Sequence, residues 1–247
     1  MMQYDVARVH AHQASATVNR APPLRVLSSM AGRKLLGDLI SKFEATSEHR
    51  VSLESVGGVD AAKRVRAGEP LDLVVLAREV IDDLIGAARI APGSRVDVWV
   101  SGVGVAVRAG AARPDISSAA GVKAAVLAAR RVGYSTGPSG QYLAKLFAGW
   151  DADGKLKDRI TVAPPGVPVG SLVARGDIDL AFQQLSELGG EGIEVLGPLP
   201  PDIQMLTTFS GGVALSSTQP DAARSLLAFF ASPAMKRLKQ AHGLDAP

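Results

Sequence analysis

The alternation of short apolar segments with amphipathic helical periods is the feature of this 247-residue chain that most restricts its fold. After a Pro-Pro pair, the apolar segment LRVLS precedes AGRKLLGDLISKFEAT, whose apolar residues recur at helical spacing. RVSLES then precedes VDAAKRVRAG, and LDLVVLA precedes REVIDDLIGAARI. Three successive strand–helix units predict a parallel, right-handed, doubly wound sheet.

The second half of the chain repeats this order of elements with a different sequence. RRVGYS, RITVAPPG, IDLAFQQ and IEVLGPLP read as strands, and QYLAKLFAGW and VPVGSLVARG read as helices. IQMLTTFSGGVALSS reads as two strands around a glycine pair, and two helices end the chain. We therefore predict an α/β protein of two lobes, each a mainly parallel sheet flanked by helices, with a ligand cleft between them.

This pattern also predicts where the chain divides. We expect a flexible leader at 1–23, a first lobe at 24–98 plus 207–247, and a second lobe at 99–206. Strands near Trp99–Arg108 and Gln204–Ser216 are expected to cross between the lobes. The leader has no apolar core of the kind that signal peptides carry, and no later segment is long enough to span a membrane. We expect a cytoplasmic protein, or a periplasmic one if a signal peptide was removed or missed.

The composition excludes several kinds of site. Hydrophobic residues make up 47% and aromatic residues 4% of the chain, so the core is expected to be aliphatic, as suits parallel strands covered by helices. The net charge is only +3, with cations dispersed among anions, which argues against a nucleic-acid partner. There is no cysteine, and the four histidines lie in the leader or near element ends. We therefore predict neither a metal nor a cofactor.

Ligands of open α/β sheets bind beyond the carboxyl ends of the strands, at the strand–helix turns. Each of these turns combines small or hydroxyl residues with a helix N-terminus, which favours an anionic ligand. The turns are Ser28–Arg33, Val56–Asp60, Tyr134–Gly140, Pro164–Gly170 and Gln183–Glu187. None carries the glycine spacing of a dinucleotide site, and the lysine of a phosphate loop is missing after TGPSG.

Several polar residues of these turns have two possible structural roles. Ser28 and Ser29 either cap the first helix or face the ligand. The planar Arg33 guanidinium suits a carboxylate, but an arginine in a first helical turn also commonly points to water. Two glutamines end the apolar strand of FQQLSE; by strand alternation one is expected to face solvent, and the other to be available to a ligand oxygen.

From Leu24 to its end, the chain resembles the type II periplasmic solute-binding proteins, and among them the molybdate-binding family. The resemblance lies in VLSSMAGRKLLGDLISKF, AAKRVRAGEPLDLVVLA, GPSGQYLAKLFAGW and SLVARGDIDLAF. It implies a two-lobed protein that binds a small anion and, if exported, delivers it to an ABC permease. Two oxyanion ligands of that family, a second hydroxyl and a tyrosine, are replaced here near Gly57-Gly58 and Gln184, which implies a larger pocket suited to carboxylates.

Three further segments, LESVGGVDAAKRV, GYSTGPSG and PPGVPVGSLVARG, are similar to the aconitate isomerase branch of the same fold. This resemblance implies an enzyme that moves an allylic proton in a small di- or tricarboxylate, interconverting trans- and cis-aconitate. We favour this function, with isomerase as the enzyme class. The alternative is the substrate-binding component of an ABC importer for molybdate or a related small anion.

The isomerase hypothesis assigns two sets of residues by their place in the predicted turns. The candidates for proton transfer are Tyr134, Glu187, Glu54 and Lys34. The candidates for substrate binding are Ser28, Ser29, Arg33, Gly57, Gly58, Ser135, Thr136, Ser139, Val167 and Gln184.

Overall fold

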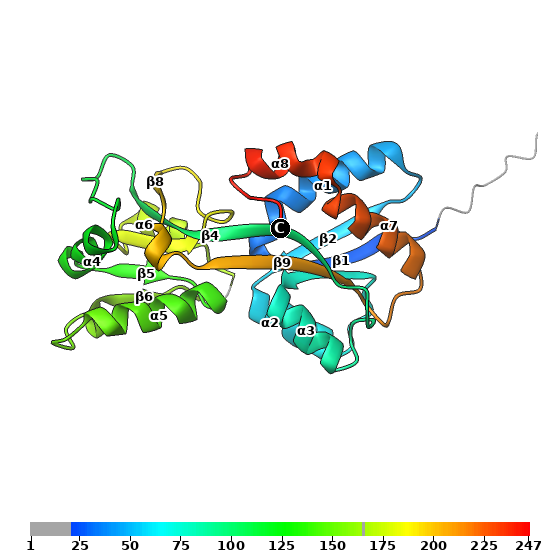
Figure 1. Cartoon of the computed structure of the whole chain (residues 1–247), viewed down its shortest axis with the longest axis horizontal. Coiled ribbons are helices and arrows are strands. Elements are labelled where there is room, and N and C mark those ends of the chain that lie inside the picture. The colour runs from blue at the N-terminus through cyan, green and yellow to red at the C-terminus, as the bar shows by residue number, and fades with distance from the viewer. Residues whose placement is uncertain (1–20, 165) are drawn as a thin grey trace, which may run out of the picture.

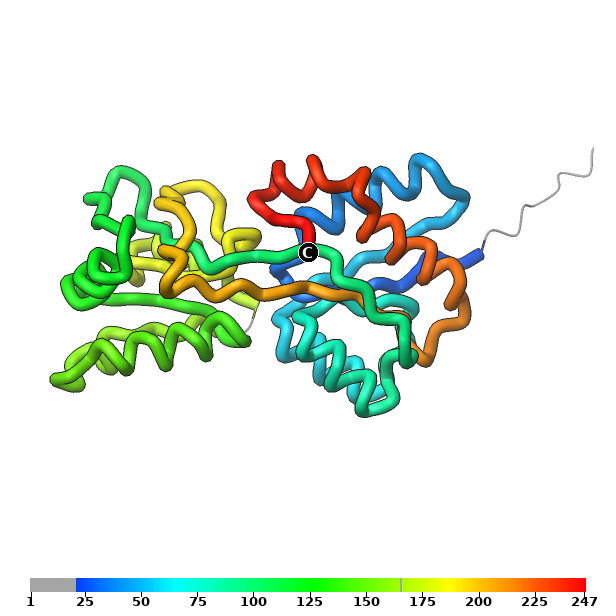
Figure 2. Tube along the Cα trace, viewed as in Figure 1, coloured from blue at the N-terminus to red at the C-terminus, as the bar shows by residue number. Residues whose placement is uncertain are grey.

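The structure is a computed structural model that describes residues 21–164 and 166–247. It shows an α/β protein of two halves, and two long antiparallel strands lie along the line that joins them (Figure 1). These strands are β4 (Val96–Arg108) and β9 (Leu206–Val213). The tube trace shows the same two segments side by side in the middle of the molecule (Figure 2).

Parallel strands form the centre of the first half. Its elements are β1 (Leu24–Ser29), α1 (Arg33–Thr46), β2 (Val51–Val56), α2 (Gly58–Arg66), β3 (Leu73–Ala77), α3 (Arg78–Gly86), α7 (Pro220–Ala231) and α8 (Lys236–Ala241). The strand order is β2-β1-β3 with parallel pairing, and β9 joins β3 antiparallel. One apolar cluster packs α1 and α7 against the sheet, and a second cluster packs α2 and α3 against it. Figure 1 shows the two helix pairs on opposite faces.

The second half has the same arrangement. Its elements are α4 (Ala119–Ala128), β5 (Val132–Tyr134), α5 (Pro138–Trp150), β6 (Ile160–Val162), α6 (Val169–Arg175), β7 (Leu180–Gln184) and β8 (Ile193–Pro198). Strands β7, β5 and β6 are parallel, whereas β4 pairs antiparallel with both β7 and β8. Because β4 pairs with β9 along its first part and with β7 along its last, one continuous strand order connects both halves.

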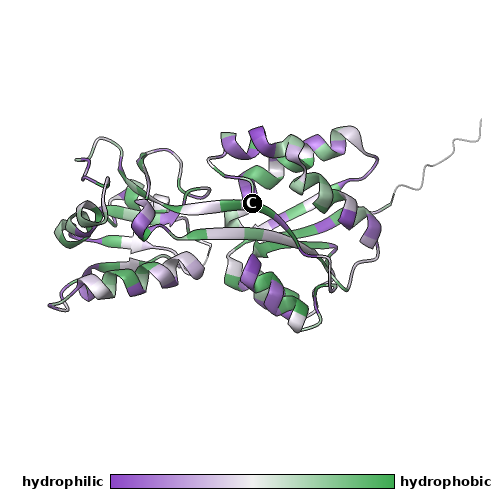
Figure 3. Ribbon diagram, viewed as in Figure 1, coloured by the Kyte–Doolittle hydropathy of each residue, from purple (hydrophilic) through white to green (hydrophobic). Residues whose placement is uncertain are grey.

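The core is mainly aliphatic, as the composition predicts, although its largest fully buried side chains include Trp99, Phe147, Phe182 and Phe230. The strands are largely apolar, and the helices carry polar and apolar residues on different faces (Figure 3). Strand β3 is buried at every position, which explains its continuous apolar sequence. In the described part of the chain, no helix is both long and apolar enough to cross a membrane.

Two sequence-based expectations differ from the observed elements. The segment expected to form two strands around Gly211-Gly212 is the single strand β9. A Cβ at Gly211 would lie 2.4 Å from Leu227 Cδ1, and one at Gly212 would lie 2.5 Å from Ile90 Cγ2. The glycines therefore allow the packing of α7 and of the loop at Ile90 against the sheet, and do not mark a turn.

The other difference is α4, which we did not predict. Its sequence, AAGVKAAVLA, is apolar almost throughout, so no periodic stripe marks it as a helix. The predicted leader 1–23 falls outside the described residues except for 21–23. The lobe limits at 98/99 and 206/207 remain our own division of the chain.

Candidate functional site

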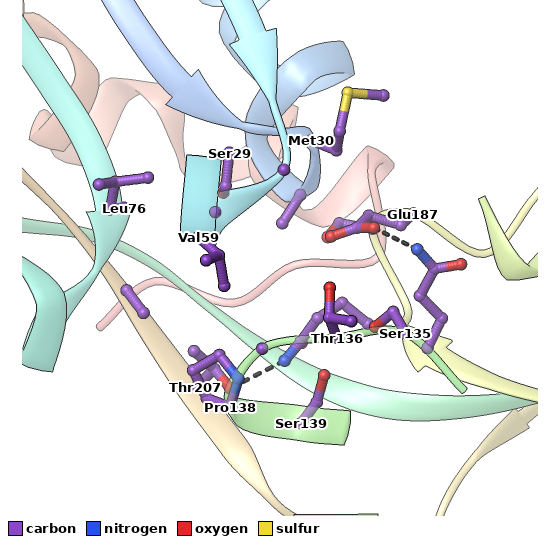
Figure 4. A pocket seen from close by; sticks show the side chains of 18 of the residues that line it. Ser29, Met30, Val59, Leu76, Ser135, Thr136, Pro138, Ser139, Glu187 and Thr207 are labelled. Carbon is purple, nitrogen blue, oxygen red and sulfur yellow. Dashed lines mark hydrogen bonds between the residues drawn. The ribbon is translucent and has the colours of Figure 1, made fainter. Parts of the chain in front are cut away.

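A cleft of about 730 Å³ opens between the two halves. Its walls come from the turns that follow β1, β2, β5 and β7, from the turn before α6, and from the crossing strand β9. Figure 4 shows Ser29, Val59 and Leu76 on one side of this space, and Ser135, Thr136 and Glu187 on the other. Both halves therefore contribute to one site, at the carboxyl ends of the parallel strands.

Two of the glycines that line this cleft are the N-cap residues of helices. The N-cap of α2 is Gly57 and that of α5 is Gly137, and neither has a side chain that could accept from the first N–H groups. The positive end of each helix dipole adds to those unsatisfied donors. The two helix ends therefore favour a ligand with negatively charged oxygens.

The charges of the cleft also favour an anion. Its lining includes four exposed cations from α1 and α2: Arg33, Lys34, Lys63 and Arg66. Glu187 is the single carboxylate among the described lining residues. Lys34 extends toward the opposite half, because a Cβ at Gly189 would lie 3.7 Å from Lys34 Nζ. The cations therefore line the first-half side of the cleft, and Glu187 lines the second-half side.

The pKa of the Glu187 carboxyl is shifted far from its ordinary value. Burial raises the pKa of its carboxyl from the ordinary 4.5 to about 7, and a hydrogen bond from the Gln183 amide opposes that rise. Gln183 Nε2 donates to Glu187 Oε2, and Gln183 Oε1 accepts from the Val169 N–H at 2.9 Å. A carboxyl with a pKa near 7 can both accept and return a proton near neutral pH.

Two serine hydroxyls of the lining lack hydrogen-bond partners among the described residues. They are Ser29 Oγ and Ser186 Oγ, and both atoms are buried. Ser29 is the N-cap residue of the 3-10 turn at Met30–Gly32, but its side chain makes no capping bond. The capping interpretation of Ser29 is therefore wrong, and its hydroxyl remains available to a ligand.

Ser28 does not line the cleft. It is fully buried behind Ser29, where Ser28 Oγ and Ser55 Oγ lie 2.8 Å apart. Strand alternation turns Ser28 away from the neighbouring Ser29. Its hydroxyl links β1 to β2, so Ser28 has a structural role in place of the two roles we considered.

The expectation that one of the two glutamines faces solvent is wrong. Gln183 is 2% exposed and Gln184 is 5% exposed, because both faces of β7 are covered. In the amide orientation that satisfies both of its ends, the Gln184 oxygen accepts from Thr207 Oγ1 at 2.8 Å and its nitrogen donates to Ser101 Oγ at 2.9 Å. Gln184 lines the cleft, but its polar atoms connect β7 to the crossing strands.

Two of the four candidates for proton transfer lie outside the cleft lining. Glu54 is exposed on β2 and forms a paired interaction with Arg64, at 2.5 and 2.7 Å, which lowers the pKa of Glu54. Tyr134 is packed into the second-half core, 6.0 Å from the Phe147 ring, and burial raises its pKa. Lys34 and Glu187 are the two candidates that the structure brings to the cleft.

Most candidates for substrate binding do line the cleft. They are Ser29, Arg33, Gly57, Gly58, Ser135, Thr136, Ser139, Val167 and Gln184. Ser139 is 4% exposed, in the first turn of α5. Sequence reasoning missed the contribution of α2, whose Val59, Lys63 and Arg66 lie on the cleft side. Their spacing of i, i+4 and i+7 was a readable signal.

The apolar part of the lining was also missed. Met30, Leu76 and Val80 from the first half add apolar side chains to the lining, as does the exposed Val59. In the described residues, no group of three or more His, Cys, Asp or Glu could hold a metal ion. The described lining is therefore that of an interlobe cleft with cations on one side, several apolar side chains and one carboxyl.

The sequence matches the family described as bacterial extracellular solute-binding protein, over residues 24–245. The chain belongs to this family. It is 34% identical over 229 residues to an aconitate isomerase from a Pseudomonas species, with 89% of this chain and 87% of that protein covered.

Two solved structures show the same fold. The periplasmic molybdate-binding protein of Azotobacter vinelandii superposes with a TM-score of 0.75 at 20% identity, covering 91% of this chain and 99% of that one. A sulfate-binding protein of Mycobacterium tuberculosis superposes with a TM-score of 0.71 at 17% identity, covering 91% and 86%. The predicted two-lobed type II solute-binding fold is confirmed.

Proposed function

We propose that this protein is an isomerase that interconverts trans- and cis-aconitate by moving an allylic proton. The similarity to an aconitate isomerase along most of both chains supports this activity. The observation that carries the proposal at the site is Glu187, a lone carboxyl with a pKa of about 7 in a cleft whose other charged lining residues are cations. Such a carboxyl is suited to proton transfer at neutral pH.

The proposed reaction begins with the substrate held by its carboxylates. Arg33 and Lys34 bind them from the first half, and the N-terminus of α5 with Ser135 and Thr136 binds them from the second. The ionised Glu187 then removes a proton from the methylene carbon beside the double bond. The electron pair left behind delocalises over the allyl carbons and into an adjacent carboxylate.

The return of the proton completes the reaction. Protonated Glu187 delivers a proton to the far carbon of the allyl system, and the double bond forms between the other two carbons. One C–H bond breaks and one forms, so the reaction needs neither an oxidant nor a second substrate. Nearby cations and helix N–H groups stabilise the charge that develops on the carboxylate. Lys34 is the second candidate for a proton donor, since it reaches toward Gly189, two residues from Glu187.

The experiment that tests this function is incubation of purified protein with trans-aconitate, followed by chromatographic separation of the isomers. We expect cis-aconitate to accumulate until both isomers reach equilibrium, and the E187Q variant to be inactive. A folded wild-type protein that leaves trans-aconitate unchanged would overturn the proposal.

A binding role remains the second candidate function, favoured by the membership of an extracellular solute-binding family. In that case the cleft binds a small anion for an ABC permease, and the protein is exported, in contrast to our cytoplasmic expectation. Isothermal titration with aconitate, molybdate and sulfate separates the two functions. Tight binding of one anion without turnover of aconitate supports transport.

A further inference from the structure

Gln183 lies between the start of α6 and the carboxyl of Glu187. Its side chain is almost entirely buried, at 2% exposure, and both ends of its amide have partners. Oε1 accepts from the backbone N–H of Val169, the first residue of α6, at 2.9 Å. Nε2 donates to Glu187 Oε2.

The first of these bonds fixes the orientation of the amide. A backbone N–H can only donate, so the Gln183 atom facing Val169 must be the oxygen. The NH₂ group is then directed at Glu187, where it can only donate. An ionised carboxylate accepts such a bond with either oxygen, and the bond uses Oε2.

We propose that Gln183 is the positioning residue of this site: anchored on α6, it holds one oxygen of Glu187 and leaves the other oxygen available to the substrate. The inference rests on the proposed function, in which Glu187 transfers the proton. Among the described residues, Gln183 is the one hydrogen-bond partner of the Glu187 side chain. Rotation of the carboxyl is therefore controlled by this amide and by packing.

The other charged groups of the cleft do not pair with Glu187. No cation in the described chain lies within 4.0 Å of its carboxylate oxygens. The lining residues from α5 and from the turn before α6 are uncharged, and those from α1 and α2 include Arg33, Lys34, Lys63 and Arg66. Burial and the Gln183 bond are accordingly the two causes of the altered Glu187 pKa, with opposite signs.

The test replaces Gln183 and measures the protonation of Glu187 directly. Q183M keeps the length of the side chain but cannot form either bond, and Q183E keeps an acceptor for the Val169 N–H. The pH midpoint of the Glu187 titration is measured by carboxyl carbon NMR of the full chain, and E187Q is used to assign the signal. The pH profile of kcat/KM for trans-aconitate is measured on the same variants.

We expect the Glu187 midpoint to rise by about 1 pH unit or more in Q183M, because a donor to the charged form is lost. In Q183E, residues 183 and 187 are both carboxyls and titrate as a coupled pair. Repulsion between the two charges therefore raises the higher of the two pH midpoints above the wild-type value. The lower limb of the kcat/KM profile moves with the midpoint, and kcat at pH 7 falls about fivefold or more, because the ionised fraction of Glu187 drops from about one half to about one tenth. The matched control Q240M, on the exposed side of α8, changes neither quantity.

Two outcomes would overturn the inference. One is a Glu187 midpoint that stays unchanged in folded Q183M and Q183E. The other is a midpoint that moves while the pH profile of turnover does not. Failure of the proposed function gives a different result, in which the wild-type protein has no turnover at all; the NMR midpoints then decide by themselves whether Gln183 controls the Glu187 carboxyl.

Discussion

At the scale of single residues, the site depends on one acid in an environment that disfavours its charge. Glu187 is partly withdrawn from water, and its nearest polar partner is a neutral amide. The other carboxylate we considered, Glu54, has the opposite surroundings, since it is exposed and paired with Arg64. Glu54 within β2 and Glu187 in the turn after β7 therefore differ in the chemistry available to them.

The first prediction concerns turnover. E187Q keeps the shape of the side chain but cannot remove a proton, so kcat should fall at least about 100-fold while aconitate still binds. Turnover assays and isothermal titration measure the two effects. The control E191Q changes an exposed glutamate of the same loop and should leave kcat as it is. Retention of full activity in E187Q would contradict the assignment.

The second prediction concerns stability and pH. The pKa of Glu187 is about 7 in the folded state, against an ordinary 4.5, so the folded protein binds more protons than the unfolded chain between these values. The Glu187 contribution to the free energy of unfolding therefore falls as the pH rises from about 4.5 to 7. Relative to wild type, E187Q should gain about 1–3 kcal/mol between pH 4 and pH 8 in urea denaturation. A constant difference would contradict the raised pKa.

At the scale of elements, the turn between β5 and α5 is held in place by the close packing of a glycine. Gly140, in the first turn of α5, packs so closely that a Cβ would lie 1.7 Å from the Ser135 carbonyl oxygen. That contact sets the path of residues 135–137 along the cleft. The N-cap Gly137 has a φ of 103°, which an L side chain rarely adopts.

The third prediction follows from this close packing. G140A should displace the 135–137 turn, lower the free energy of unfolding by about 1–3 kcal/mol and weaken ligand binding. G149A in the same helix is the control, because a Cβ there meets no atom within 4 Å. It should be neutral or raise stability by up to about 1 kcal/mol. Equal effects of the two variants, measured by urea denaturation, would argue against the packing role.

The elements also show what the sequence could and could not predict. Strand–helix alternation was readable because each buried face repeats at a fixed period, and it located the turns that line the cleft. Contacts between elements that are distant in the chain could not be predicted from the sequence. Gly211-Gly212 resembles a turn signal, but its cause is contact with Leu227 and Ile90, which are distant in the sequence. Gln183 and Gln184 alternate along β7 as expected, but helices and strands cover both faces.

At the scale of the whole molecule, the two halves meet the ligand from opposite sides and are linked by β4 and β9. The cations lie on the first half and Glu187 on the second. In the proposed reaction the substrate carboxylates therefore meet the cations while the methylene carbon meets Glu187. Lys34 already lies near Gly189 across the cleft. Binding energy from the remote carboxylates is then available to bring the halves together and exclude water from the reacting carbons.

The fourth prediction is that a bound tricarboxylate stabilises the whole chain. At a concentration of 100 times Kd, a ligand that binds only the folded state adds about 2.7 kcal/mol. For a chain of this size, Tm should rise by roughly 5–10 °C. Differential scanning calorimetry with trans-aconitate measures the rise, and K34A should reduce it because a cation that binds carboxylate is lost. A rise of the same size with K34A would contradict the role of Lys34.

The measurement that tests the central claim most directly is the proton NMR spectrum of trans-aconitate in D₂O with the purified protein. The proton-shift account predicts that the signals of cis-aconitate appear and that deuterium enters the methylene position, because the Glu187 proton exchanges with solvent between turnovers. With E187Q neither change should occur. If the folded wild-type protein produces no cis isomer and incorporates no deuterium, the claim that this cleft catalyses an allylic proton shift is wrong.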